Sequence, residues 1–149
     1  MKKYILILMV LPALLLASCS LFGEEDAVMA EVEQQRRQWE RLGIDTYEYD
    51  LTLICFCLYV GPVRVQVRAD TVHAATALET GEPVTDFFQA RTIDSLFDLL
   101  EDAAEREAHR LDAEYDDAFH YPTRVDIDYD QNIADEEIGY TAENFRSLQ

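Results

Sequence analysis

The sequence predicts an α+β fold in which two helices pack on one face of an antiparallel β-sheet, arranged as two helix–strand–strand units. Two segments carry apolar residues at helical spacing, and each is followed by segments in which apolar and polar residues alternate. The stretch 61–67 also resembles the stretch 121–127 at an offset of 60 residues. A chance likeness between two amphipathic strands is the alternative explanation, and the predicted architecture does not depend on the repeat.

Each predicted helix has an apolar stripe and a recognisable end. Over residues 28–42, spacings of three and four residues place the apolar side chains on one face, and Gly43 is a natural C-cap. Thr92 is the expected N-cap of the second helix, whose buried stripe runs from Ile93 to Leu111. Both helices therefore have one face with which to cover a sheet.

Alternation predicts the strands, the clearest at residues 47–57 and 63–68. One apolar face forms only if odd residues meet odd residues, so we expect Cys57 opposite Val63 and Cys55 opposite Val65, with a three-residue loop at 59–61. Residues 78–91, with Gly81 and Pro83, are expected to form a surface connection. The remaining predicted strands lie near residues 70–77, 111–115, 123–129 and 138–145.

Residues 1–18 are typical of a lipoprotein signal peptide. Lys2 and Lys3 precede an apolar run, and Leu16-Ala17-Ser18-Cys19 has the small-residue pattern of a lipobox. The run is shorter than the roughly 20 apolar residues that a membrane span needs. We expect a lipoprotein of the palmitate-bearing kind whose mature chain begins at Cys19 with diacylglycerol on its sulfur. An ordinary signal peptide followed by an incidental cysteine is the alternative.

The same segment predicts location and domain organisation. A lipidated Cys19 would anchor the protein in the bacterial cell envelope, and Ser20 favours the outer membrane where a cell has two membranes. Residues 19–26 are expected to form a flexible acidic tether, and residues 27–149 a single domain.

The charge of the chain excludes some partners. Its formal net charge is −18, and removal of Lys2 and Lys3 leaves 10 basic against 30 acidic residues, or −20, in the mature chain. Nucleic acid and anionic lipid both bind to basic surface patches, so neither is an expected partner of this acidic chain. The membrane contact must then come from the N-terminal lipid. The acidic surface serves solubility, or it binds cations or a basic partner.

Short motifs follow one another in a fixed order along the chain. They are Trp39, Gly43-Ile44-Asp45, Tyr47-x-Tyr49, Cys55-Phe56-Cys57, Gly61-Pro62-Val63-Arg64-Val65, Gly81-Glu82-Pro83-Val84, Thr92-Ile93-Asp94-x-Leu96-Phe97-Asp98-Leu99, Tyr121-Pro122-Thr123, Ile127-Asp128-Tyr129, Ala134-Asp135-Glu136-Glu137 and Tyr140. In this order the chain resembles the bacterial domain-of-unknown-function family 6174, common in secreted proteins and lipoproteins, over about residues 39–145. It departs at His120, where the family commonly has glycine. The resemblance implies an envelope location and a compact domain, with no established activity.

Cys55 and Cys57 are the first candidate site. An oxidising envelope favours a disulfide. In a regular strand, however, residues i and i+2 have Cα atoms about 6.7 Å apart and parallel side chains, so a bridge requires a bulge or turn at Phe56. Two buried thiols are the alternative, and a redox or metal site is a third.

The second candidate is an acidic loop that matches positions of a calcium-binding loop at Asp126, Asp128, Asp130 and Glu137. Gln131 stands where such loops need glycine, and the residues before Asp126 are typical of a strand. We therefore expect no cofactor, with weak calcium binding as the alternative.

The third candidate is a surface on the face of the sheet opposite the helices. Ile54, Phe56 and Leu58 would lie there, near Arg64, Arg68 and Arg124. An apolar patch rimmed by charge often binds a protein. Alternatively, the connection 78–91, with Phe87 and Phe88, folds over the patch and buries it.

Enzyme motifs are missing from the sequence: it has no nucleophile-elbow serine, no phosphate-binding glycine loop and no His–Glu metal motif. The sequence therefore favours a lipid-anchored envelope domain that binds or scaffolds an unknown envelope protein. The alternatives are a thiol–disulfide-active protein that uses Cys55 and Cys57, and a weak calcium-binding lipoprotein.

Overall fold

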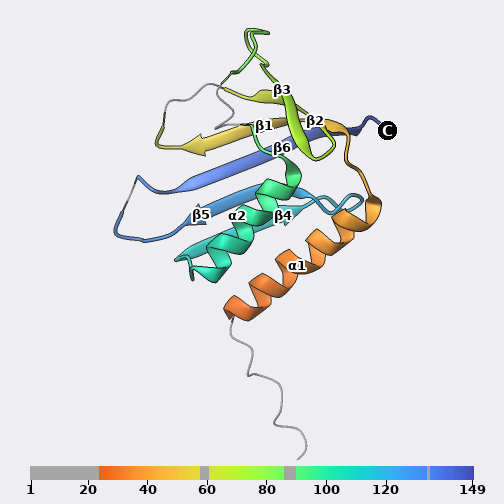
Figure 1. Ribbon diagram of the computed structural model, residues 1–149. Coiled ribbons are helices and arrows are strands. Elements are labelled where there is room, and N and C mark those ends of the chain that lie inside the picture. The colour runs from red at the N-terminus through yellow and green to blue at the C-terminus, as the bar shows by residue number, and fades with distance from the viewer. Residues whose placement is uncertain (1–23, 58–60, 86–89, 134) are drawn as a thin grey trace, which may run out of the picture.

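The computed structural model describes the chain outside residues 1–23, 58–60, 86–89 and 134. Two helices lie side by side on one face of a six-stranded antiparallel sheet (Figure 1), which confirms the predicted α+β class. No described helix is long and apolar enough to span a membrane. In chain order the elements are α1 (Glu24–Leu42), β1 (Tyr47–Cys55), β2 (Val63–Arg68), β3 (Thr71–Ala77), α2 (Ile93–Glu105), β4 (Arg110–Tyr115), β5 (Pro122–Asp128) and β6 (Ile138–Ser147).

The sheet has the strand order β3-β2-β1-β6-β5-β4. Each half of the chain therefore supplies a helix followed by three antiparallel strands, one strand more than the predicted helix–strand–strand unit. The repeated stretches at 61–67 and 121–127 correspond to β2 and β5, the middle strand of each three-stranded half. Because β1 pairs with β6, the two halves form one continuous sheet.

Alternation along the strands sorts the side chains onto two faces. Tyr47, Tyr49, Leu51 and Leu53 of β1 point toward the helices and are almost completely buried. Trp39 of α1 packs on this layer with its ring centroid 5.5 Å from that of Tyr47. The opposite face of the sheet carries no helix (Figure 1), and we call it the open face.

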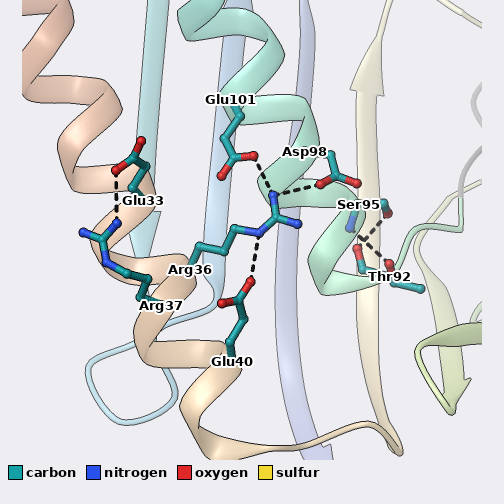
Figure 2. Close-up of polar contacts among 8 residues, drawn as sticks. All are labelled: Glu33, Arg36, Arg37, Glu40, Thr92, Ser95, Asp98 and Glu101. Carbon is teal, nitrogen blue, oxygen red and sulfur yellow. Dashed lines mark hydrogen bonds and ion pairs between the residues drawn. The ribbon is translucent and has the colours of Figure 1, made fainter.

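α2 is held by its apolar stripe and by its ends. The buried side chains are Ile93, Leu96, Phe97, Leu100 and Ala103. Thr92 is the N-cap, and its hydroxyl oxygen accepts a hydrogen bond from the Ser95 amide at 3.1 Å. Figure 2 shows this cap beside Arg36 of α1, whose guanidinium lies 2.6 Å from Glu101 and 2.8 Å from Asp98 of α2. These ion pairs tie the two helices together on the side away from the sheet.

The predicted second helix is too long. α2 ends at Glu105, and Leu111 lies in β4 instead. Glu107 adopts a left-handed φ of 53°, and the Ala108 amide donates to the Ala103 carbonyl at 3.0 Å. This is a Schellman ending, which usually uses glycine. A glutamate at that position gives no such signal in the sequence.

The predicted register of the first hairpin is wrong, although its parity is right. Val63 lies opposite Leu51 and Val65 opposite Tyr49, so odd residues do meet odd residues. Cys55 pairs with Ile138 of β6 rather than with Val65. The end of β1 beyond Leu51 is thus used by β6 alone, and the connection to β2 is much longer than three residues.

The start of α1 also differs from the prediction. The helix takes in residues 24–26, which the sequence assigned to the tether. Val32 and Trp39 of the predicted stripe are buried, whereas Leu42 is 42% exposed. Cys19 and residues 20–23 lie outside the described residues.

Candidate ligand-binding surface

The open face is hollowed where β1 ends and β6 begins. Three residues lie directly across the sheet from one another there, Ile54 on β1, Gly139 on β6 and Asp126 on β5. The cavity has a volume of about 250 Å³. We call it the end hollow, and its principal lining residues are Ile54, Phe56, Arg110, Asp126, Glu137 and Gly139.

Gly139 forms the floor of the end hollow because it has no side chain. A Cβ added there would lie 3.0 Å from Asp126 Oδ1, 3.2 Å from the Val125 carbonyl oxygen and 3.5 Å from Ile54 Cβ. A lone glycine inside a strand weakens it and often marks a place where another group approaches closely. Sequence reasoning missed Gly139, although an isolated glycine in an alternating run was the available signal.

The rim of the end hollow is unusually apolar for an open surface. Ile54 is 53% exposed and Phe56 is 82% exposed. Ile54 follows the buried Leu53 in β1 and lies on the open face, whereas Phe56 lies in the bend after the strand ends. Leu58, Phe87 and Phe88 lie outside the described residues.

Cys55 and Cys57 form a disulfide in the structure, with their Cα atoms 5.2 Å apart. The chain bends after Cys55, which is the turn at Phe56 that a bridge between residues i and i+2 requires. The bend ends β1 and leaves the Phe56 side chain at the tip of the turn. Cys55 is half-buried and Cys57 is exposed, so neither belongs to the buried core.

Carboxylates supply the polar part of the end hollow. Asp126 accepts a hydrogen bond from Arg124 Nε at 2.6 Å, and the Arg124 side chain is more than half exposed whereas that of Asp126 is 25% exposed. Glu137, immediately before β6, also lines the hollow. Arg110 also contributes to the lining. The hollow can therefore receive an apolar group next to a cationic one, because apolar surface and acidic oxygens are within one cavity.

The predicted calcium residues do not form one cluster. Asp130 accepts hydrogen bonds from the backbone and side-chain nitrogens of Asn132 at 3.0 and 2.8 Å, in the turn after β5. Asp128 is buried, and its Oδ1 has no hydrogen-bond partner. In the part of the chain that the structure describes, no group of three or more His, Cys, Asp or Glu side chains could hold a metal ion.

Arg64 and Arg68 lie on β2, away from the end hollow. Arg64 forms a two-point hydrogen bond with Asp50 of β1, at 2.8 and 2.9 Å. Asn144 also donates to Asp50, and the hydrogen bond from Arg64 is the main reason why the pKa of Asp50 is lowered. The buried carboxylate of Glu48 bonds Arg146 beside this pair. This network occupies the half of the open face farthest from the end hollow, so its arginines do not rim the apolar patch.

A second cleft lies on the other side of the molecule and was not predicted. It has a volume of about 420 Å³, and its lining includes Trp39, Asp45, Asp70 and Asp94. Burial, and secondly the charge of Asp70, raise the pKa of Asp94. Crowded carboxylates of this kind attract cations in general, but none of the strongly exposed large apolar side chains lines this cleft, unlike Ile54 and Phe56 at the end hollow.

Comparison with known proteins gives one match. The model of a family described as "Family of unknown function (DUF6174)" matches residues 31–147. The matched range begins inside α1 and ends with β6, so it covers both helices and the whole sheet. No curated protein and no solved structure matches the chain.

Proposed function

Because the chain belongs to the DUF6174 family, whose function is unknown, we propose its function from its own residues: it is a lipid-anchored envelope domain that binds another protein through the end hollow. The observation that carries the proposal is the exposure of Phe56 beside the carboxylates of Asp126 and Glu137. An exposed aromatic side chain next to a cavity is stabilised when another molecule covers it.

The chemistry of the end hollow defines the partner. An apolar side chain would pack on Ile54 and Phe56, and a neighbouring lysine or arginine would reach Asp126 or Glu137. The mature charge of −20, from 10 basic and 30 acidic residues after the signal peptide, would attract such a basic segment at long range. The same charge makes nucleic acid an unsuitable ligand.

Anchoring would bring the domain close to the membrane. α1 begins at Glu24, five residues after Cys19. Five residues span at most about 17 Å when fully extended. If Cys19 is lipidated, the partner must therefore be another protein of the same envelope or one that reaches its surface.

Site-specific cross-linking in intact cells tests the binding proposal. A photoreactive amino acid in place of Phe56 should give one discrete adduct with another protein, and Gly139→Ala in the same chain should reduce that adduct. The matched control places the same group at Leu42, which is 42% exposed at the far end of α1. Adducts of equal pattern from both positions, or none from position 56, would contradict the proposal.

Thiol–disulfide exchange is the second candidate function, because Cys57 is exposed and the disulfide lies at the rim of the end hollow. In that reaction a substrate thiolate would attack one sulfur, form a mixed disulfide and release the other cysteine as a thiolate. A reduction potential close to that of known envelope oxidants, together with oxidation of a dithiol peptide, would favour this function. A strongly negative potential without exchange would exclude it.

A further inference from the structure

The two edges of the sheet differ in how they are covered. At the β3 edge, residues 82–84 lie alongside the strand: the Val84 amide donates to the Ala75 carbonyl at 2.9 Å, and the Ala77 amide donates to the Glu82 carbonyl at 3.0 Å. At the opposite edge, β4 pairs with β5 only. Within the described residues, no backbone hydrogen bond reaches the outer side of β4. Unpaired strand edges are templates for another strand.

The side chains of β4 alternate in charge and in polarity. Arg110, Asp112 and Glu114 lie on the open face, opposite Asp128, Asp126 and Arg124 of β5. The residues between them face the helices and are half-buried. Arg110 has only a weak intrastrand partner, since its Nε is 3.8 Å from Asp112 and both side chains are more than half exposed. Charged side chains on an edge strand usually prevent pairing with another strand. On β4, however, the basic Arg110 and the acidic Glu114 stand at opposite ends of the charged row, so two antiparallel copies of the strand would place them opposite each other.

We propose that β4 binds β4 of a second copy of this chain, antiparallel, with Asp112 opposite Asp112 of the second copy. In this register Arg110 lies opposite Glu114 of the second copy, and the two-fold symmetry repeats that pair. The helices of both copies then lie on the same side of one continuous sheet. The partner of this edge is thus the chain itself.

Parity and charge select this register. Residues directly opposite one another must point to the same face, so only every second register is possible. Two registers pair five residues of β4 in each copy. One places Arg110 opposite Glu114, and the other places Asp112 opposite Glu114. Opposite charges across strands stabilise and like charges destabilise, so the first register is favoured.

Charge-swap variants of the full chain test the proposal. Sedimentation in density-matched detergent measures the mass of the protein, and so its association into dimers, as a function of concentration. We expect a concentration-dependent dimer that Arg110→Glu weakens about tenfold, because two attractive pairs become repulsive. Glu114→Arg should weaken it similarly, and the double variant should restore it, because the pairs are again of opposite charge. Asp112→Asn should strengthen the dimer by removing the central repulsion.

Two comparisons exclude a general effect of charge. Arg110→Glu makes the chain more acidic and Glu114→Arg makes it less acidic, so net charge alone would move the dimer in opposite directions. Arg68→Glu, on the open face of β2, changes the charge by the same amount as Arg110→Glu and should leave the dimer unchanged. A monomer at all concentrations, an equal effect of Arg68→Glu, or a folded double variant that stays monomeric would overturn the proposal. The mass is measured without the partner of the end hollow, so the two proposals fail independently.

Discussion

Replacing Gly139 by alanine tests the geometry of the end hollow directly. Gly139 does not have a left-handed φ, so alanine can adopt its backbone conformation. The new methyl group would meet the Val125 carbonyl oxygen at 3.2 Å and Asp126 Oδ1 at 3.0 Å. The aspartate side chain can rotate away, but the carbonyl belongs to the paired strand β5 and can move only with the sheet.

Two opposing effects decide the sign of the change. Alanine restricts the unfolded chain, which stabilises the protein by about 0.4–1 kcal/mol at an unstrained position. Overpacking against a fixed backbone costs about 1–3 kcal/mol. We therefore expect Gly139→Ala to lower the free energy of unfolding by about 1 kcal/mol and to fill the floor of the end hollow.

Urea unfolding followed by tryptophan fluorescence measures this change, since Trp39 is the single tryptophan and is buried. Thr141→Val is the matched control, because it lies two residues along the same strand and face and keeps the side-chain volume. It should shift stability by less than about 0.5 kcal/mol. If Gly139→Ala stabilises the protein by about 0.5 kcal/mol or more, a methyl group at position 139 does not meet Val125 and Asp126 at these distances.

Three further predictions concern the core, the open face and the anchor. Trp39→Ala and Phe97→Ala should each lower stability by about 3–5 kcal/mol in urea unfolding, and losses below about 1 kcal/mol at both would mean that these side chains do not hold the helices on the sheet. Arg64 lowers the pKa of Asp50, so the stabilising effect of the ionised carboxylate is complete above the unfolded pKa and is lost as the pH falls through the folded pKa. Thermal unfolding of Asp50→Asn should therefore depend less on pH in the acidic range than the unchanged protein does, and an unaltered pH profile would refute this link. Cys19→Ala should block signal processing or move the protein from the membrane to the soluble fraction, and unchanged fractionation would exclude lipidation.

Regular patterns in the sequence were sufficient to predict the two layers of the fold, the pair of helices and the sheet. The stripes of the two helices and the alternation of the strands depend only on local periodicity, and the structure shows both helices on the apolar face that these patterns define. The register of the first hairpin needed non-local information. Parity fixes which faces match, but only the competition of β6 for the end of β1 determines which odd residues meet.

For the candidate site, too, some features follow from local sequence patterns and others depend on contacts between distant residues. Alternation along β1 is enough to place Ile54 on the face away from the helices, whereas the exposure of Phe56 depends on the bend that follows the strand. The sequence could not show that Gly139 of β6 lies beside Ile54, because that contact joins residues 85 positions apart. It also grouped Arg64 with this patch, whereas the structure pairs that arginine with Asp50 farther along β1. Periodicity predicts which residues of a strand share a face of the sheet. Which residues of different strands lie next to one another depends on the strand order.

Hydroxyl-radical footprinting of Phe56 tests most directly whether the end hollow binds a partner in the cell. Phe56 is 82% exposed and Leu42 is 42% exposed, so both should be oxidised in the purified protein. In intact cells the binding proposal predicts that oxidation of Phe56 falls several-fold relative to that of Leu42. An equal ratio of the two in cells and in purified protein would show that the end hollow is uncovered, which would contradict the proposal.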